Sequence, residues 1–304
     1  TFNGGLTEST GGTVNIAGTI SSSNDAISFG AVTLQANTDI DTNATTNAGD
    51  ITLGAVTGRA FNLTLSTGNN ISGADISVSG AVNDVSTLSL SNVGGTATFS
   101  GSVGNSQAVT NFNAGNTVAN IAFTGASNIF TNVADFGNDG TLTFGDATGD
   151  SFTFNGGLAT SGVGGTVTLN TNISSSDDPL TFGAITLGNN VVINTNANSQ
   201  QDDITIGAIT GGNNTLTLIT EDNVSGADVT VSGNISGVTT LTLQSIGGTA
   251  TFSGDVDVTT LTVSNNVANL ALTGDGTTIA SSFSPSNDGT LVLGDSSGDT
   301  LTFN

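Results

Sequence analysis

The segment Gly94-Gly95-Thr96-Ala97-Thr98-Phe99 occurs again, unchanged, 153 residues later as Gly247-Gly248-Thr249-Ala250-Thr251-Phe252. Segments on either side of it repeat as well. Thr1-Phe2-Asn3-Gly4-Gly5-Leu6 returns at residues 153–158, an offset of 152, and Asn138-Asp139-Gly140-Thr141-Leu142 returns at residues 287–291, an offset of 149. Self-similarity on this scale is typical of tandem repeats. The sequence therefore predicts one copy in residues 1–152, a second in residues 153–301, and the start of a third in residues 302–304.

A shorter period lies inside each copy. Apolar anchors recur every 20 to 25 residues within each of the two series that follow. They are Phe29, Leu53, Val78, Phe99, Phe123 and Phe144 in the first copy, and Phe182, Ile206, Val231, Phe252, Leu272 and Leu293 in the second. A period of this length matches one coil of a β-helix.

Around the anchors, apolar and hydroxyl residues alternate, as in Ile51-Thr52-Leu53 and Leu142-Thr143-Phe144. Alternation places one face of a strand in the core and the other in water. Segments rich in Gly, Asn and Asp between the strands supply corners. We expect an all-β, right-handed parallel β-helix of about 14 coils of roughly 20–25 residues, with almost no helix. A β-sandwich array is the alternative, but it does not reiterate one motif in every coil.

The composition limits the possible partners. The chain carries a net charge of −23, a single basic residue, Arg59, and neither His nor Cys. Nucleic-acid binding depends on basic residues, so we expect none. No apolar run is long enough to cross a bilayer, and we expect no membrane insertion. Divalent cations are the natural partners of such an acidic surface.

Three motifs carry a family resemblance: Ala208-Ile209-Thr210-Gly211, Val231-Ser232-Gly233 and Thr240-Leu241-Thr242-Leu243. They resemble the β-strand repeats of large bacterial surface adhesins of the filamentous-haemagglutinin-like and autotransporter-like groups. The resemblance covers the whole chain in composition and rhythm. It implies a right-handed β-helix, secretion to the cell surface, a role as stalk or adhesive fibre, and no catalytic residues.

From these observations we expect a structural or adhesive extracellular fibre segment that is not an enzyme. Neither end of the chain has the sequence of a capping element, since it opens on Thr1-Phe2-Asn3 and closes on Thr302-Phe303-Asn304. A solenoid otherwise needs its terminal coils covered. We therefore expect further copies of the same repeat as partners, through covalent continuation or axial stacking.

Calcium is the one candidate cofactor. Gly145-Asp146-Ala147-Thr148-Gly149-Asp150 recurs as Gly294-Asp295-Ser296-Ser297-Gly298-Asp299, which makes Asp146, Asp150, Asp295 and Asp299 candidate metal ligands. Two carboxylates in a glycine-bearing corner suit an oxygen-ligated cation. Asp after Gly is also ordinary turn chemistry. Asp177-Asp178 and Asp202-Asp203 are further acidic pairs. A calcium-dependent binding module on an adhesin is thus an alternative function.

Two other functions stay open as weaker alternatives. A carbohydrate-active β-helix enzyme could work with paired carboxylates alone, but this chain offers no His or Lys and only Arg59 to hold an acidic sugar. Arrays of Thr-x-Thr, such as Thr260 and Thr262, could order water and bind ice. Thr is equally the natural outward residue of a strand.

Overall fold

The protein is described by a computed structural model that covers residues 1–8, 11–47, 49–68, 71–199, 202–221 and 224–304. These residues form β-strands joined by turns, with no helix among them. The chain divides into two compact units. The first comprises Thr1–Phe152 with Gly162–Thr166, and the second comprises Thr153–Ser161 with Val167–Asn304.

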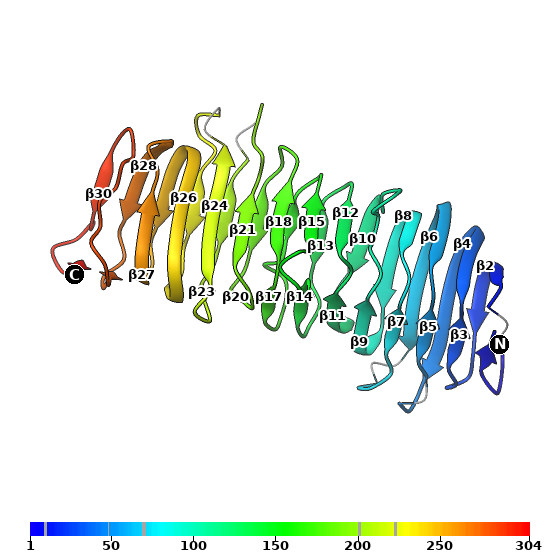
Figure 1. Ribbon diagram of the computed structural model, residues 1–304. Helices are drawn as coiled ribbons and strands as arrows, with labels where there is room; N and C mark the ends of the chain where they lie inside the picture. Colours follow the sequence, from blue (N-terminus) through cyan, green and yellow to red (C-terminus); the bar gives the residue numbers. More distant parts are fainter. Residues whose placement is uncertain (9–10, 48, 69–70, 200–201, 222–223) are drawn as a thin grey trace. The chain divides into compact units, whose positions relative to one another are not determined.

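The strands of the first unit alternate between short and long segments (Figure 1). They are β1 (Leu6–Thr7), β2 (Thr13–Ser21), β3 (Ile27–Phe29), β4 (Ala31–Ala44), β5 (Ile51–Leu53), β6 (Val56–Gly68), β7 (Ile76–Val78), β8 (Val82–Ser91), β9 (Val93–Phe99), β10 (Asn111–Ala114), β11 (Val118–Phe123), β12 (Ser127–Phe130), β13 (Ala134–Phe136), β14 (Leu142–Phe144) and β15 (Ser151–Phe154), the last of which continues into the second unit.

The second unit is built in the same way. Its strands are β16 (Leu158–Ala159), β17 (Val167–Leu169), β18 (Asn172–Ser175), β19 (Leu180–Phe182), β20 (Ile185–Leu187), β21 (Val191–Asn194), β22 (Ile204–Ile206), β23 (Ile209–Thr210), β24 (Thr215–Glu221), β25 (Val229–Val231), β26 (Ile235–Phe252), β27 (Val256–Val263), β28 (Val267–Leu272), β29 (Thr278–Ile279), β30 (Leu291–Leu293) and β31 (Thr302–Phe303).

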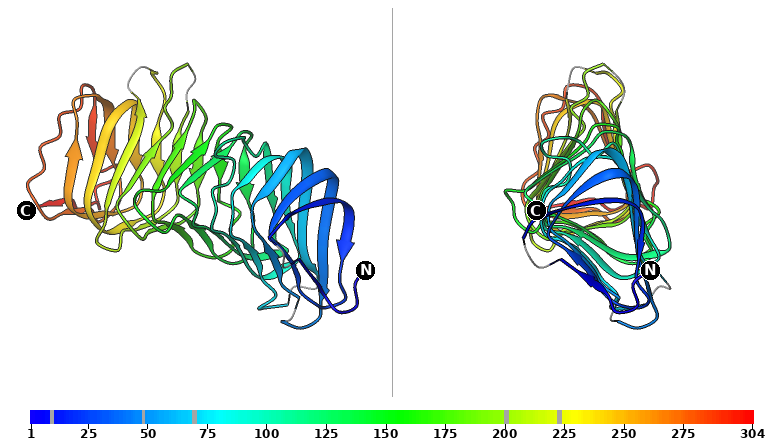
Figure 2. Two further views of the ribbon diagram at one scale, coloured as in Figure 1. Left: turned by 45° about the vertical axis from the view of Figure 1, so that its right-hand side comes forward. Right: turned by 90° about the vertical axis from the view of Figure 1, so that its right-hand side faces the viewer.

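In the first unit the strands pair in parallel with the equivalent strands of the next coil. One series of pairs runs through β1, β3, β5, β7, β9, β11 and β14, and another runs through β2, β4, β6, β8, β10 and β13. The register confirms the predicted anchors, because Phe99 lies opposite Phe123, and Phe123 lies opposite Phe144. Figure 2 shows these coils, in blue and cyan, wrapping around the interior of the unit.

The second unit follows the same rule. Phe182 is the register partner of Ile206, Ile206 of Val231, and Val231 of Phe252. The 18 residues of β26 run around the coil without interruption and pair with β23, β24 and β25 of the preceding coil. The fold is therefore the parallel β-solenoid that the sequence predicts.

The structure has about 12 turns, close to the expected number of about 14. Corner loops account for the difference, because they add residues without adding a turn. One such loop, residues 145–150, lies between β14 and β15.

Phenylalanine fills much of the core of the first unit. The Phe123 ring stacks on Phe99, with centroids 5.2 Å apart, and lies nearly parallel to Phe144 at 6.1 Å. Phe130 and Phe152 meet the same ring edge-on at 5.8 and 6.1 Å. All five side chains are fully buried. Offset and edge-to-face contacts of this kind add to the burial of the rings.

Replacing the central ring should strongly destabilise the first unit. We expect Phe123→Ala to lower the free energy of unfolding by about 3–5 kcal/mol, because it leaves a cavity among six other phenylalanine rings. Thr143→Ala, which changes a half-buried outward residue of β14, is the control and should cost about 0.5 kcal/mol. Urea unfolding followed by circular dichroism measures both variants, and equal effects would contradict this packing.

Candidate functional sites on the acidic surface

Aspartate side chains join successive coils outside the core. Asp50 Oδ1 accepts a hydrogen bond from the backbone N–H of Asp75 at 2.9 Å, and Asp75 Oδ1 accepts one from Thr96 N–H at 2.7 Å. The second unit repeats both bonds at 2.8 and 2.6 Å, with Asp203, Asp228 and Thr249. Bonds to an ionised carboxylate are stronger than neutral ones. Much of the acidic charge therefore fastens one coil to the next.

Asparagine makes the same connection at other corners. Asn120 Oδ1 accepts from Thr141 N–H at 2.9 Å, and Asn269 Oδ1 accepts from Thr290 N–H at the same distance. The sequence analysis missed these side-chain bonds between coils. The signal was present, since Asp50 and Asp75, like Asp203 and Asp228, are separated by one coil length of 25 residues.

The recurrent Gly-Asp corners are self-contained turns. Asp150 Oδ2 accepts hydrogen bonds from the N–H groups of Asp146 and Ala147 at 2.9 and 3.0 Å. Asp150 is buried, whereas Asp146 is exposed. Gly145 precedes the turn with a φ of +77°, a conformation that favours glycine. The second Asp of the motif therefore holds the turn closed.

The corner in the second unit has the same geometry. Asp299 Oδ2 accepts from the N–H groups of Asp295 and Ser296 at 2.7 and 3.0 Å, and its Oδ1 accepts from the Ser296 hydroxyl at 2.6 Å. The hydroxyl and backbone bonds lower the pKa of Asp299. Gly294 repeats the positive φ at +76°.

Calcium binding at Asp146, Asp150, Asp295 and Asp299 stays a prediction. Each pair is brought together by one local turn, and a carboxylate oxygen of Asp150 and of Asp299 is already bonded to backbone N–H groups. Within the described ranges, no group of three or more acidic side chains is arranged to hold a metal ion. The turn alone explains why the motif recurs.

The two carboxylates of the turn contribute differently to stability, because Asp150 accepts two backbone N–H groups and Asp146 is exposed. We expect Asp150→Ala to lower the free energy of unfolding by about 1–3 kcal/mol, because two backbone N–H groups lose their acceptor. The exposed Asp146→Ala should change it by less than about 0.5 kcal/mol. Thermal unfolding in a calcium chelator measures both variants. Similar losses for the two would show that the turn is not the reason for the motif.

The two acidic pairs noted in the sequence meet at one corner of the second unit. The carboxyl of Asp202 lies within hydrogen-bonding reach of Asp177, and the charges of Asp178 and Asp203 act on it as well. Asp177 Oδ1 accepts from the N–H groups of Asn198 and Ser199 at 2.6 and 3.0 Å. The sequence analysis did not predict this convergence, although Asp177 and Asp202, like Asp50 and Asp75, are separated by one coil length of 25 residues.

Burial and neighbouring charge change the acidity of Asp202. The side chain is only 5% exposed. Desolvation first, then the bond to Asp177 and the nearby carboxylates, raise its pKa from 3.8 to about 6. Desolvation also raises the pKa values of Asp178 and Asp203. No basic residue occurs beyond Arg59, so no side chain of the second unit offsets this charge.

The raised pKa of Asp202 predicts a pH dependence of stability in the absence of divalent cations. The folded state binds the Asp202 proton more tightly than the unfolded state, so this group lowers stability as pH rises from about 4 through about 6. At pH 7, Asp202→Asn should be more stable than the parent by up to about 3 kcal/mol, and the gain should vanish near pH 4. Unfolding curves between pH 4 and 8 measure the difference. Asp146→Asn is the control, and a gain for Asp202→Asn that does not depend on pH would contradict the assignment.

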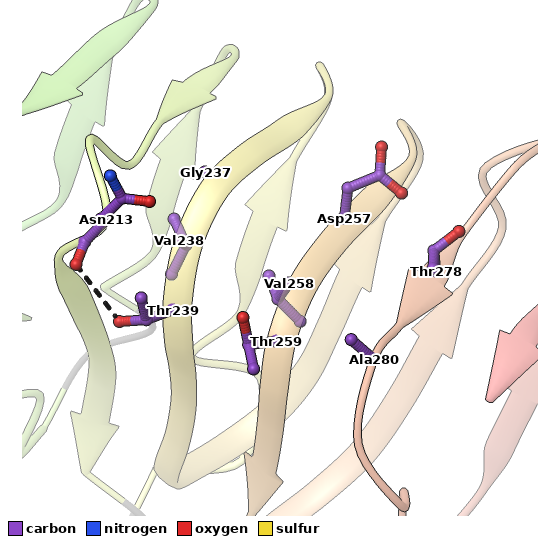
Figure 3. Close-up of a pocket in the computed structure, with 9 residues that line it drawn as sticks. All are labelled: Asn213, Gly237, Val238, Thr239, Asp257, Val258, Thr259, Thr278 and Ala280. Carbon is purple, nitrogen blue, oxygen red and sulfur yellow. Dashed lines mark hydrogen bonds between the residues drawn. The ribbon is translucent and has the colours of Figure 1, made fainter. Parts of the chain in front are cut away.

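A shallow groove crosses four coils on the outer surface of the second unit (Figure 3). Its volume is 440 Å³, and its lining includes Asn213, Thr239, Asp257, Thr259 and Thr278. Glycoside hydrolysis uses two carboxyl groups that flank the scissile bond. Asp257 is the one carboxylate in this lining. The groove offers hydroxyl and amide groups for hydrogen bonding, without the pair of carboxyls that the enzymatic alternative requires.

Arg59 lies on the surface of the first unit and takes part in a polar stack. Its Nη1 donates to Gln35 Oε1 at 2.7 Å, and Gln35 Nε2 donates to Asn15 Oδ1 at 2.8 Å. Three successive coils are linked in this way. The guanidinium therefore has a structural partner on the surface of the solenoid.

No protein-family model, curated protein or solved structure matches this chain. The likeness to bacterial adhesins thus rests on the sequence motifs alone. Among the described residues, no helix has the length and apolar character needed to cross a membrane.

Proposed function

We propose that this chain is a segment of an extracellular structural or adhesive fibre, such as the stalk of a large repeat protein, and that it is not an enzyme. The observation that carries the proposal is the register of the coils. Within each unit, equivalent residues of successive coils lie opposite one another, from Ile27, Ile51 and Ile76 to Leu180, Ile204 and Val229.

This register suits a load-bearing element. Backbone hydrogen bonds join each coil to the next, and side chains such as Asp75 and Asp228 add a second set. A force that separates two coils must therefore break several bonds together. Large core side chains, including Phe123 and Phe252, keep water away from the backbone bonds.

Further copies of the repeat are the partners we propose. Each coil pairs with its neighbours in one register, as Phe123 does with Phe99 and Phe144, and a further coil of the same repeat can pair by the same rule. It can come from the same polypeptide or from another molecule.

Divalent cations are the second class of partner in this proposal. The net charge of −23 makes neighbouring fibres repel one another. Cations that screen or bridge the carboxylates would allow lateral association. A calcium-dependent binding module remains the alternative function, and the cluster around Asp202 is the feature that favours it.

Imaging of the natural polypeptide tests the function. Antibodies raised against this chain, applied with gold labels to intact cells that make the protein, should decorate filaments outside the cell. Negative staining of material sheared from those cells should show fibres that carry the same label. Label confined to the interior of permeabilised cells, or compact labelled particles without filaments, would refute the proposal.

A further inference from the structure

We propose that the corner formed by Asp177, Thr195 and Asp202 in the second unit is a divalent-cation site, with calcium as the cation that suits its oxygen ligands. The site is separate from the Gly-Asp corners. It does not depend on whether the chain serves as a fibre.

The first copy shows the same corner with Asn24 and Gly49 in place of Asp177 and Asp202. Asn43 and Asn196 adopt positive φ angles of 47° and 50°, and Asn24 and Asp177 adopt 70° and 69°. The side-chain hydrogen bonds are equivalent as well. Asn43 Nδ2 donates to the Ser22 carbonyl oxygen at 3.1 Å, and Asn196 Nδ2 donates to the Ser175 carbonyl oxygen at 2.7 Å. The two corners therefore share one backbone conformation.

The corners differ at one buried position, where the first copy has Gly49 and the second has Asp202. A Cβ atom on Gly49 would lie only 2.5 Å from the Ala44 Cβ and 3.1 Å from the hydroxyl of Thr42, whose equivalent is Thr195. The backbone of the second corner therefore has to shift at this position to admit the Asp202 side chain. In the first copy, Thr42 Oγ1 donates to the Gly49 carbonyl.

Two buried oxygens of the second corner have no hydrogen-bond partner among the described residues. They are Asp202 Oδ2 and Thr195 Oγ1, and their side chains are 5% and 0% exposed. Leaving such atoms buried and unpaired is costly, above all for a carboxylate. Within the described part of the chain, these two oxygens are therefore open to an added ligand.

The charge of the corner points to a cation. Asp177 faces Asp202 directly, and Asp178 and Asp203 act on it from either side. The Asp177 carboxylate accepts hydrogen bonds from the N–H groups of Asn198 and Ser199 and from the Ser199 hydroxyl, which fix its position in the corner. A cation bound beside these carboxylates would offset their mutual repulsion.

Calcium fits the donor set better than magnesium. Calcium accepts carboxylate, hydroxyl and carbonyl oxygens in an irregular shell of six to eight ligands, whereas magnesium demands a regular octahedron and gives up its waters reluctantly. The corner provides two carboxylates and a hydroxyl within a rigid backbone. Water or backbone carbonyls would complete the shell.

The test compares calcium-dependent stability and calcium binding in matched variants. At pH 7.5 and constant ionic strength, calcium should raise the melting temperature of the parent by about 2–6 °C, and magnesium should raise it less. Asp202→Gly, which restores the residue found in the first copy and so preserves the fold, should lose most of this rise. Titration calorimetry with calcium should show one binding site fewer in this variant. Asp202→Asn, which keeps the size of the side chain, should behave like Asp202→Gly.

Two controls separate this corner from other calcium effects. Asp146→Asn combined with Asp295→Asn removes two exposed charges from the Gly-Asp corners and should leave the response intact. Lowering the pH to 5 should weaken it, because the Asp202 proton competes with the metal. A calcium response that survives in Asp202→Gly, or a parent that does not respond at all, would overturn the proposal. Either result would leave the fibre function to be decided by imaging.

Discussion

Each coil carries rows of backbone N–H and C=O groups along both of its edges, and only another coil in the same register can pair with them. This constraint fixes the period of the sequence. Because the register is maintained from coil to coil, core side chains of a unit lie on their equivalents in the next coil, as Phe99, Phe123 and Phe144 do. The core is therefore a stack of similar residues, and a change at one level affects the levels on both sides.

Placing the same residue type on adjacent coils is favourable for apolar rings and amides, but it brings carboxylates of like charge together, and these repel one another. The chain is strongly acidic and nearly free of basic residues, so it cannot neutralise stacked aspartates with ion pairs. The structure deals with them in two ways. Asp50 and Asp75 accept backbone N–H groups of the following coil, and Asp150 and Asp299 close local turns. Asp202 has neither arrangement, and its pKa is raised first by desolvation and then by Asp177 and the neighbouring carboxylates. We assign a cation to its corner because its buried Oδ2 has no hydrogen-bond partner among the described residues.

Much of the fold could be predicted from the sequence, because the spacing between apolar anchors equals the number of residues in one coil. Every anchor from Phe29 to Phe144, and from Phe182 to Leu293, has the register partner that the spacing predicts. The roles of the aspartates could not be predicted from the apolar period. Whether a carboxylate such as Asp150 closes its own turn or, like Asp75, reaches the next coil depends on the path of the corner backbone, which has no period. At Asp202 the sequence held two signals, the spacing of one coil length from Asp177 and the mismatch with Gly49 in the first copy.

The register is open to a direct test because the chain has no cysteine. Thr205 and Thr230 are outward-facing partners on adjacent coils, and Ser232 lies two residues further along. A disulfide needs Cα atoms within about 7 Å, which adjacent parallel strands in register provide. Under mild oxidation, Thr205→Cys with Thr230→Cys should therefore crosslink readily, while Thr205→Cys with Ser232→Cys should crosslink much more slowly. Equal or faster crosslinking of the second pair would contradict the stacking on which the whole account depends.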